Sequence, residues 1–147
     1  MAGTVTARAR TGLDRLAALA RRRFSHALMS DTKWRRLFIA FEEAGVAVRW
    51  ASVKFIDVAE PKPMTLPTGR ALHPPRPYVD TLEFGPIELR AIEWLEMPAV
   101  VLHPRGSGLP LRAIPQDLDG AEAALAARGR FPLERPPEAL RVLGYRR

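Results

Sequence analysis

The side chains best able to do chemistry are carboxylates gathered in the stretch from Tyr78 to His103, YVDTLEFGPIELRAIEWLEMPAVVLH. Five acidic residues occur there together with one arginine: Asp80, Glu83, Glu88, Glu93, Glu96 and Arg90. Paired carboxylates on adjacent strands can transfer protons or bind a divalent cation. A solvated sheet face, on which Asp80 is satisfied by an arginine or by the backbone, explains the same pattern without any chemistry. We favour the second interpretation and predict no catalytic residue.

Asp80 is the most informative of these residues because its position in the strand pattern predicts burial. It lies in the same row as Tyr78 and Leu82, which is the row we expect to be covered. Asp80 and Arg90 also lie five residues on either side of Gly85 in the turn signal Gly85–Pro86, so an antiparallel hairpin centred on Gly85 would place them opposite each other. The pattern therefore predicts a charge-assisted bond between these two side chains and a structural role for Asp80.

Metal, nucleophile and phosphate motifs are weak elsewhere in the chain. The histidines His26, His73 and His103 have neither a helical i+4 partner nor a neighbouring carboxylate, so no zinc site is predicted. The glycines of Gly106–Gly108 precede Leu109-Pro110 rather than a helix, which predicts a turn instead of a phosphate cradle. The chain contains no cysteine and therefore no thiolate ligand or disulfide. We expect no metal and no cofactor.

The stretch from Tyr78 to His103, together with His73 before it, is therefore predicted to form a surface for a partner or ligand. The candidate members are His73, Tyr78, Asp80, Glu83, Arg90, Glu93 and Trp94. The corresponding function is a non-catalytic binding or interaction module with a protein partner, similar in kind to an immunity protein. Two alternatives stay open, namely a small metal-assisted enzyme that uses the strand carboxylates and a nucleic-acid binder that uses a basic N-terminal arm.

The first 28 residues differ in charge from the rest of the chain. They hold six arginines and one aspartate, whereas residues 29–147 hold 17 basic and 15 acidic side chains, so most of the net charge of +7 is N-terminal. Apolar residues between Leu13 and Leu28 follow helical spacing, which is typical of a basic amphipathic helix. Membrane-surface binding, a transit peptide and a nucleic-acid arm are open roles for it. We favour an extension upstream of a natural start at Met29.

The nearly neutral balance of residues 29–147 predicts no strong attraction of nucleic acids by that part of the chain. No apolar run approaches the roughly 20 residues that cross a bilayer. The N-terminus also lacks the apolar core of a signal peptide, because charged residues interrupt it. These features favour a cytoplasmic location.

The first element that positions the candidate residues is a helix over 31–44. Large apolar residues recur there at helical spacing: Trp34, Leu37, Phe38 and Phe41. Ser30 is placed to cap this helix and Gly45 to end it. A second helix is expected over 117–128, with Asp117 as its cap and with buried apolar residues Leu118, Ala121 and Leu125.

Alternating apolar residues predict strands at five places: 46–58, 78–84, 87–96, a short run ending at His103, and 140–143. The alternation changes phase near Ala51–Ser52, which predicts a bulge or a bend there. It also changes near Ala91–Ile92, which predicts either a bulge or partial burial of both strand faces. The six prolines of 59–77 predict a loop without regular structure, and 104–115 is expected to be a second loop.

These elements predict an α+β fold. It has an N-terminal helix, a mainly antiparallel sheet of four or five strands, a second helix and a short C-terminal strand, because short links between strands favour antiparallel pairing. Residues 29–147 are expected to form one domain, preceded by the extension 1–28.

Four motifs distributed from Met29 to Leu143 extend this interpretation: SDTKWRRLF, VKFIDV, YVDTLEFGPIELRAIEWLE and FPLE. Together they resemble a family of small uncharacterised bacterial proteins, a domain of unknown function. The resemblance covers about four-fifths of the chain and excludes the first 28 residues. It implies a bacterial cytoplasmic protein, and it implies no activity, cofactor or site residue.

Overall fold

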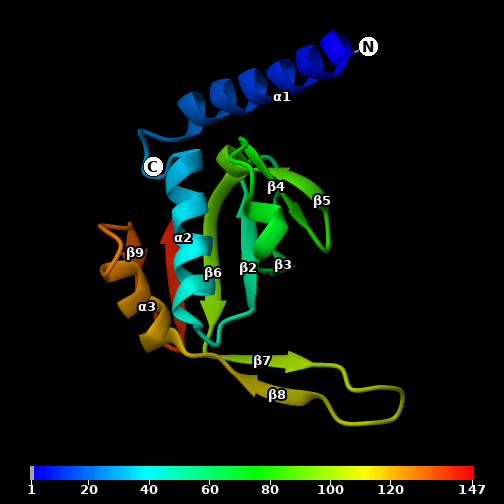
Figure 1. Ribbon diagram of the computed structural model, residues 1–147, viewed down its shortest axis with the longest axis vertical. Helices are drawn as coiled ribbons and strands as arrows, with labels where there is room; N and C mark the ends of the chain where they lie inside the picture. Colours follow the sequence, from blue (N-terminus) through cyan, green and yellow to red (C-terminus); the bar gives the residue numbers. More distant parts are fainter. Residues whose placement is uncertain (1) are drawn as a thin grey trace.

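The computed structural model describes residues 2–147, with side chains from Gly12 onward, and shows three α-helices beside an antiparallel sheet (Figure 1). The helical elements are α1 (Ala2–Arg23), α2 (Asp31–Ala44) and α3 (Leu118–Ala126), with 3-10 turns η1 (Gly69–Leu72) and η2 (Leu89–Ala91). The strands are β1 (His26–Ala27), β2 (Trp50–Phe55), β3 (Lys62–Thr65), β4 (Tyr78–Thr81), β5 (Gly85–Glu88), β6 (Ile92–Pro98), β7 (Val100–His103), β8 (Arg112–Pro115), β9 (Leu133–Glu134), β10 (Ala139–Leu143) and β11 (Tyr145–Arg146). The predicted α+β fold is confirmed.

The main sheet has five strands in the order β3-β2-β6-β10-β9, and each neighbouring pair is antiparallel. Three further ladders have two strands each, namely β1–β11, β4–β5 and β7–β8. Helix α2 lies across one face of the main sheet, with α3 beside it (Figure 1). Helix α1 lies at one end of the molecule, and the β7–β8 hairpin projects from the opposite end (Figure 1).

Helix α2 has the bounds and caps that the sequence predicts. The side chain of Ser30 accepts a hydrogen bond from the Lys33 backbone N–H at 3.0 Å, and Gly45 ends the helix in the left-handed conformation with φ of 63°. Its aromatic and aliphatic stripe is buried in the core as predicted: Trp34, Leu37, Phe38 and Phe41. The helix therefore fixes the core face of the sheet.

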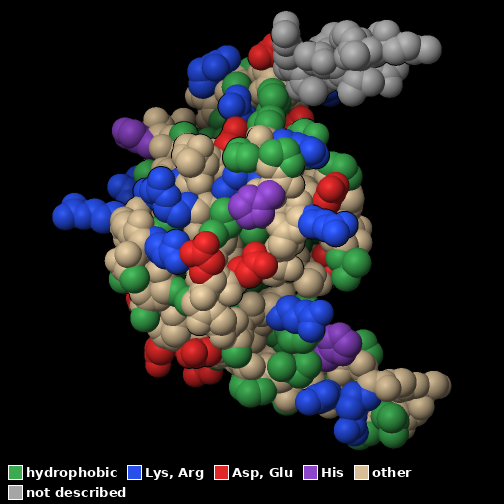
Figure 2. Space-filling view, viewed as in Figure 1, with side chains coloured by type: hydrophobic (Ala, Val, Ile, Leu, Met, Phe, Trp, Pro, Cys, Tyr) green, Lys and Arg blue, Asp and Glu red, His purple; other side chains and the backbone are tan. Residues whose placement is uncertain are grey.

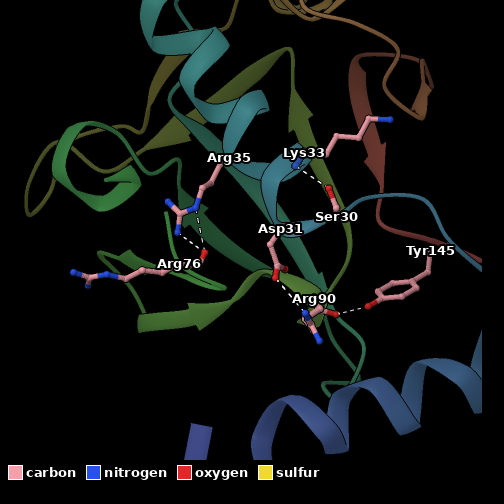
Figure 3. Close-up of polar contacts among 7 residues, drawn as sticks. All are labelled: Ser30, Asp31, Lys33, Arg35, Arg76, Arg90 and Tyr145. Atoms are coloured by element: carbon pink, nitrogen blue, oxygen red, sulfur yellow. Dashed lines mark hydrogen bonds and ion pairs between the residues drawn. The ribbon is translucent and has the colours of Figure 1, made fainter. Parts of the chain in front are cut away.

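Arg35 is buried on α2 and holds the proline-rich segment by its backbone. Its guanidinium donates twice to the carbonyl of Arg76, at 2.5 and 3.1 Å (Figure 3). It also donates to the carbonyl of Leu72 at 2.6 Å and to that of Tyr78 at 2.9 Å. The side chain is 5% exposed. A buried charge needs such partners, because an unsatisfied one is costly. Arg35 therefore fastens residues 72–78 to the helix.

The two predicted changes of strand phase have different origins in the structure. In β2 the register with β6 shifts between Lys54 and Phe55, which is later than the predicted site at Ala51–Ser52. The second change arises because η2 separates β5 from β6, so residues 87–96 belong to two ladders rather than to one bulged strand. The opposite alternations within residues 87–96 therefore reflect two strands, β5 and β6, that belong to separate sheets.

Both predicted loops contain regular structure. Residues 59–77 include β3 and η1, and residues 104–115 include β8, which pairs with β7. Pro63 fits within β3 because this strand is at the sheet edge and the missing N–H faces away from β2. This orientation follows from the neighbouring Thr65, whose N–H binds the side chain of Glu83 instead of a strand.

Helix α3 is shorter than predicted but buries the predicted face. It runs from Leu118 to Ala126, with Asp117 accepting from the Gly120 N–H at 2.9 Å as its N-cap. Three apolar residues of α3 are buried: Leu118, Ala121 and Leu125. The predicted C-terminal strand is present as β10, which pairs with both β6 and β9.

The N-terminal segment packs on the rest of the chain. Leu16, Ala20 and Phe24 are buried and belong to the same hydrophobic core as α2 and the main sheet. The ring of Phe24 stacks on Tyr145 with centroids 5.0 Å apart, and β1 pairs with β11. No helix of the described residues is long and apolar enough to cross a membrane. A natural start at Met29 and a boundary at residue 28 stay predictions.

Candidate functional site

The predicted pairing of Asp80 with Arg90 is wrong, because the turn of the β4–β5 hairpin lies earlier than Gly85–Pro86. In the observed register Asp80 is opposite Pro86, and residues 82–84 form the turn. The Thr81 hydroxyl closes this turn, accepting from the Phe84 N–H at 3.0 Å and donating to the Gly85 carbonyl at 2.8 Å.

This register also exposes the row that we predicted to be covered. Asp80 is exposed, whereas Val79 and Thr81 on the opposite row are buried. Leu82 is 84% exposed because it belongs to the turn and not to the strand. The alternation from Tyr78 to Phe84 therefore combines strand and turn residues. For this reason the prediction from that alternation assigned the wrong face of the strand to the core.

Arg90 is held by other partners. It lies in η2, and its guanidinium donates to Asp31 Oδ2 at 3.4 Å, near the start of α2 (Figure 3). Its backbone carbonyl accepts from the Tyr145 hydroxyl at 2.6 Å. Arg90 thereby connects η2 with α2 and β11.

The other predicted surface residues do not converge on one site. Glu93 lies 3.6 Å from Arg147, and Trp94 has the Arg141 guanidinium 4.5 Å from its ring centroid. His73 is exposed after η1. Among the residues whose side chains are described, no group of three or more carboxylates and histidines has a metal-binding arrangement. Two of the predicted surface residues line cavities. Glu83 lines one cavity and Tyr78 lines another, and both cavities are described below.

The first cavity lies between the β7–β8 hairpin, the β4–β5 turn and the β2–β3 edge of the main sheet, and we call it the hairpin groove. Its volume is about 720 Å³. Its principal charged and aromatic lining residues are Arg49, Trp50, Glu83, His103, Arg105 and Arg112. Figure 2 shows basic, histidine and apolar side chains together on the projecting hairpin. The groove is thus predominantly basic.

The strand register places two of these side chains side by side. His103 on β7 is paired with Arg112 on β8, and paired residues of an antiparallel ladder share one face. The His103 ring lies 5.4 Å from Trp50, and the Arg49 guanidinium lies 5.6 Å from the same Trp50 ring. The Trp50 ring therefore has both the His103 imidazole and the Arg49 guanidinium as close neighbours.

Gln116 fixes the backbone on the sheet side of the groove. Its Oε1 accepts from the backbone N–H groups of Arg49 and Trp50, both at 2.9 Å. Its Nε2 donates to the carbonyls of Trp50 at 3.0 Å and Pro98 at 2.9 Å. The side chain is buried, and these four hydrogen bonds are all to backbone atoms. Gln116 therefore positions Arg49 and Trp50 without entering the groove.

The single carboxylate of the groove is already engaged. Glu83 accepts from the Thr65 N–H at 2.9 Å and from the Thr65 hydroxyl at 2.7 Å. None of the three groove arginines forms an ion pair with a residue whose side chain is described. The positive charge of Arg49, Arg105 and Arg112 is therefore available to a ligand.

The second cavity lies between α1, β5 and the end of β2, and we call it the α1 cavity. It has a volume of about 760 Å³ and is lined mainly by apolar residues such as Leu16, Phe55 and Ile87. Glu88 is half-buried in its wall. Burial, with a further contribution from Asp57, raises the pKa of the Glu88 carboxyl above its ordinary value. The α1 cavity thus contains a carboxyl in an apolar setting.

Replacing Glu88 by glutamine is expected to flatten the pH dependence of stability. Because its folded pKa is raised, Glu88 contributes stability that is complete below the unfolded pKa of 4.5 and is lost as the pH rises through the folded pKa. The Glu88→Gln chain should therefore lose less stability between about pH 4.5 and pH 7. Thermal melts across this range measure the difference. Glu60→Gln, at an exposed position, is the control, and equal slopes for both variants would contradict the expectation.

Comparison of the chain with protein-family models, with curated proteins and with solved structures found no match. The class that the fold and the groove define is an α+β domain with a basic cavity between two hairpins. The resemblance to a family of small bacterial proteins stays a prediction.

The sequence contained one signal for the hairpin groove that we did not use. Short apolar runs lie on both sides of Gly106–Gly108, so that 100–103 and 112–115 are placed symmetrically about a turn. That symmetry predicts a hairpin and brings His103 and Arg112 together. Arg49 and Glu83 lack any such local signal, because they reach the groove from other parts of the chain.

Proposed function

We propose that the protein is a non-catalytic binding module that holds an anionic partner in the hairpin groove. The observation that supports the proposal is the convergence of Arg49, Arg105 and Arg112 around a carboxylate that is already hydrogen-bonded to Thr65. Arginine stays protonated and offers five N–H donors, which suits recognition of carboxylate or phosphate oxygens rather than proton transfer.

The residue types also support binding to a macromolecule. Arginine and tryptophan are enriched at the energetic centres of interfaces, and the groove contains both. The same pair favours a second candidate function, because arginines beside an aromatic ring are a common arrangement for single-stranded nucleic acid. A cytoplasmic location in a bacterium and a likeness to immunity proteins remain part of the proposal.

A triple variant with Arg49→Gln, Arg105→Gln and Arg112→Gln is expected to bind anionic probes at least about tenfold more weakly. Each phosphate contact contributes about 0.7–0.9 to the slope of log K against log salt, so the slope for oligothymidylate should fall by about 2. The probes are labelled polyglutamate and labelled oligothymidylate. Fluorescence anisotropy at several salt concentrations measures both quantities, and the probe that binds more tightly distinguishes the two candidate functions.

A charge-matched control separates the groove from the bulk charge of the protein. Arg21→Gln, Arg36→Gln and Arg130→Gln remove the same charge from exposed positions outside the groove. This control should retain affinity within about threefold, because distant exposed charges are screened. Equal losses in both triple variants, or binding of neither probe by the natural chain, would overturn the proposed function.

A further inference from the structure

The exposed large hydrophobic side chains are concentrated on the two hairpins that border the groove. Among the residues whose side chains are described, they are Leu82, Phe84, Val100, Leu102, Leu109 and Leu111. Leu82 is in the β4–β5 turn, and the last four are in the β7–β8 hairpin or its turn. A local concentration of exposed apolar side chains marks an interaction site.

The β7–β8 hairpin separates its apolar and basic side chains by strand alternation. His103 and Arg112 form one cross-strand pair, and both line the groove. Leu102, opposite Ala113, therefore points to the other face, where it is 63% exposed. In the connecting turn Leu109 and Leu111 are 57% and 56% exposed, on either side of Pro110 and close to Arg105. The projecting end thus combines leucines with arginines.

The sheet edge beside the groove does not offer backbone pairing to a partner. The outward N–H of Thr65 is bound by Glu83, and Pro63, which faces the same way, has no N–H. An added peptide strand would therefore find no free donor along this part of β3. The available attraction comes from side chains alone, namely cationic heads and apolar leucines.

We infer that the β7–β8 hairpin docks on an anionic membrane surface, with Leu109 and Leu111 of its connecting turn in the interfacial layer and the groove arginines on lipid phosphates. This inference rests on the proposed function and names the anion as a lipid headgroup. Binding at such surfaces combines burial of apolar side chains with attraction between basic residues and anionic lipids, and each is present here. A narrow projecting hairpin also suits a deformable surface better than the broad face of a folded protein.

The natural chain is expected to co-sediment with vesicles of phosphatidylcholine and phosphatidylglycerol but not with vesicles of phosphatidylcholine alone. Leu109→Ser with Leu111→Ser should weaken binding to the mixed vesicles at least about tenfold, because the buried apolar area is lost. This pair should leave soluble oligothymidylate or polyglutamate binding unchanged. Ser107→Leu, in the same exposed turn, should strengthen vesicle binding.

Each contrary outcome has a distinct meaning. If the variant with Leu109→Ser and Leu111→Ser binds mixed vesicles as tightly as the natural chain does, the hairpin is not inserted in the membrane, and charge attraction alone explains the binding. A chain that binds polyglutamate or oligothymidylate but neither vesicle would overturn the inference, favour a protein or nucleic-acid partner, and leave the proposed function intact. Two results together support the proposed function and the membrane inference. The triple arginine variant should lose binding to the soluble probes and to the vesicles, whereas the variant with Leu109→Ser and Leu111→Ser should lose binding to the vesicles alone.

Discussion

Replacing Arg35 by methionine is expected to lower the free energy of unfolding by about 3–5 kcal/mol. The substitution removes the donor shared by the carbonyls of Leu72, Arg76 and Tyr78, which then lie against an apolar side chain. Hydrogen bonds from charged donors contribute about 1.5–3 kcal/mol each, and buried acceptors left alone add a penalty. Urea unfolding measures the loss, and limited proteolysis should show earlier cleavage within residues 59–77.

The neighbouring arginine supplies the control for Arg35. Arg36 has the same chemistry one position later on α2, is exposed, and is expected to accept methionine with a change of at most about 0.5 kcal/mol. Arg35→Lys should recover only part of the loss, because one ammonium group cannot reach three carbonyls in the geometry of the guanidinium fork. Equal stabilities of Arg35→Met and Arg36→Met would show that the clamp contributes nothing.

A chain that begins at Met29 is expected to lose about 3–6 kcal/mol of stability. It lacks Leu16 and Phe24, and burial of each large apolar side chain contributes about 1.5–3 kcal/mol. It also lacks the β1–β11 ladder and the stacking of Phe24 on Tyr145. Thermal and urea unfolding of the two chain lengths test this directly.

Single substitutions distinguish packing of α1 from its charge. Phe24→Ala in the full chain should account for about 3 kcal/mol, whereas Arg21→Ala, at an exposed position on the same helix, should be nearly neutral. A shortened chain that melts within about 2 °C of the full chain would contradict the packing and support the extension hypothesis.

The parts of the fold that were predictable are those with local causes. Helix α2 has a complete local description, because Ser30, the apolar spacing and Gly45 each act within a few residues. Asp117 identified the start of α3 for the same reason. The antiparallel pairing of β4 with β5 followed from their short connection, whereas β2–β6 and β6–β10 pair strands that are far apart in the sequence.

The β4–β5 register was not predictable from the same kind of pattern. Gly85, with φ of 66°, is a genuine turn signal, but it ends a turn that Thr81 closes and is itself the first residue of β5. Leu82 in that turn is apolar and continues the alternation of the preceding strand. Only packing against the core decides which row is buried, and periodicity alone cannot supply that information.

The candidate site was the least predictable part. The hairpin groove is assembled from Arg49, Glu83, Arg105 and Arg112, which belong to three separate segments of the chain. Net charge averaged over residues 29–147 conceals this cluster, because acidic residues elsewhere balance it. The carboxylates that attracted attention in the sequence instead lie apart, with Glu93 and Glu96 beside Arg147 and Arg141.

The position of β10 has a consequence for how the protein is made. It lies between β6 and β9, yet it comes later in the chain than every other strand of the main sheet. During synthesis the edge of β6 that will pair with it, including Leu95 and Met97, must wait until residues 139–143 leave the ribosome. Folding of the sheet is therefore completed by a late, non-local strand insertion, and the growing chain exposes an unpaired strand edge until then.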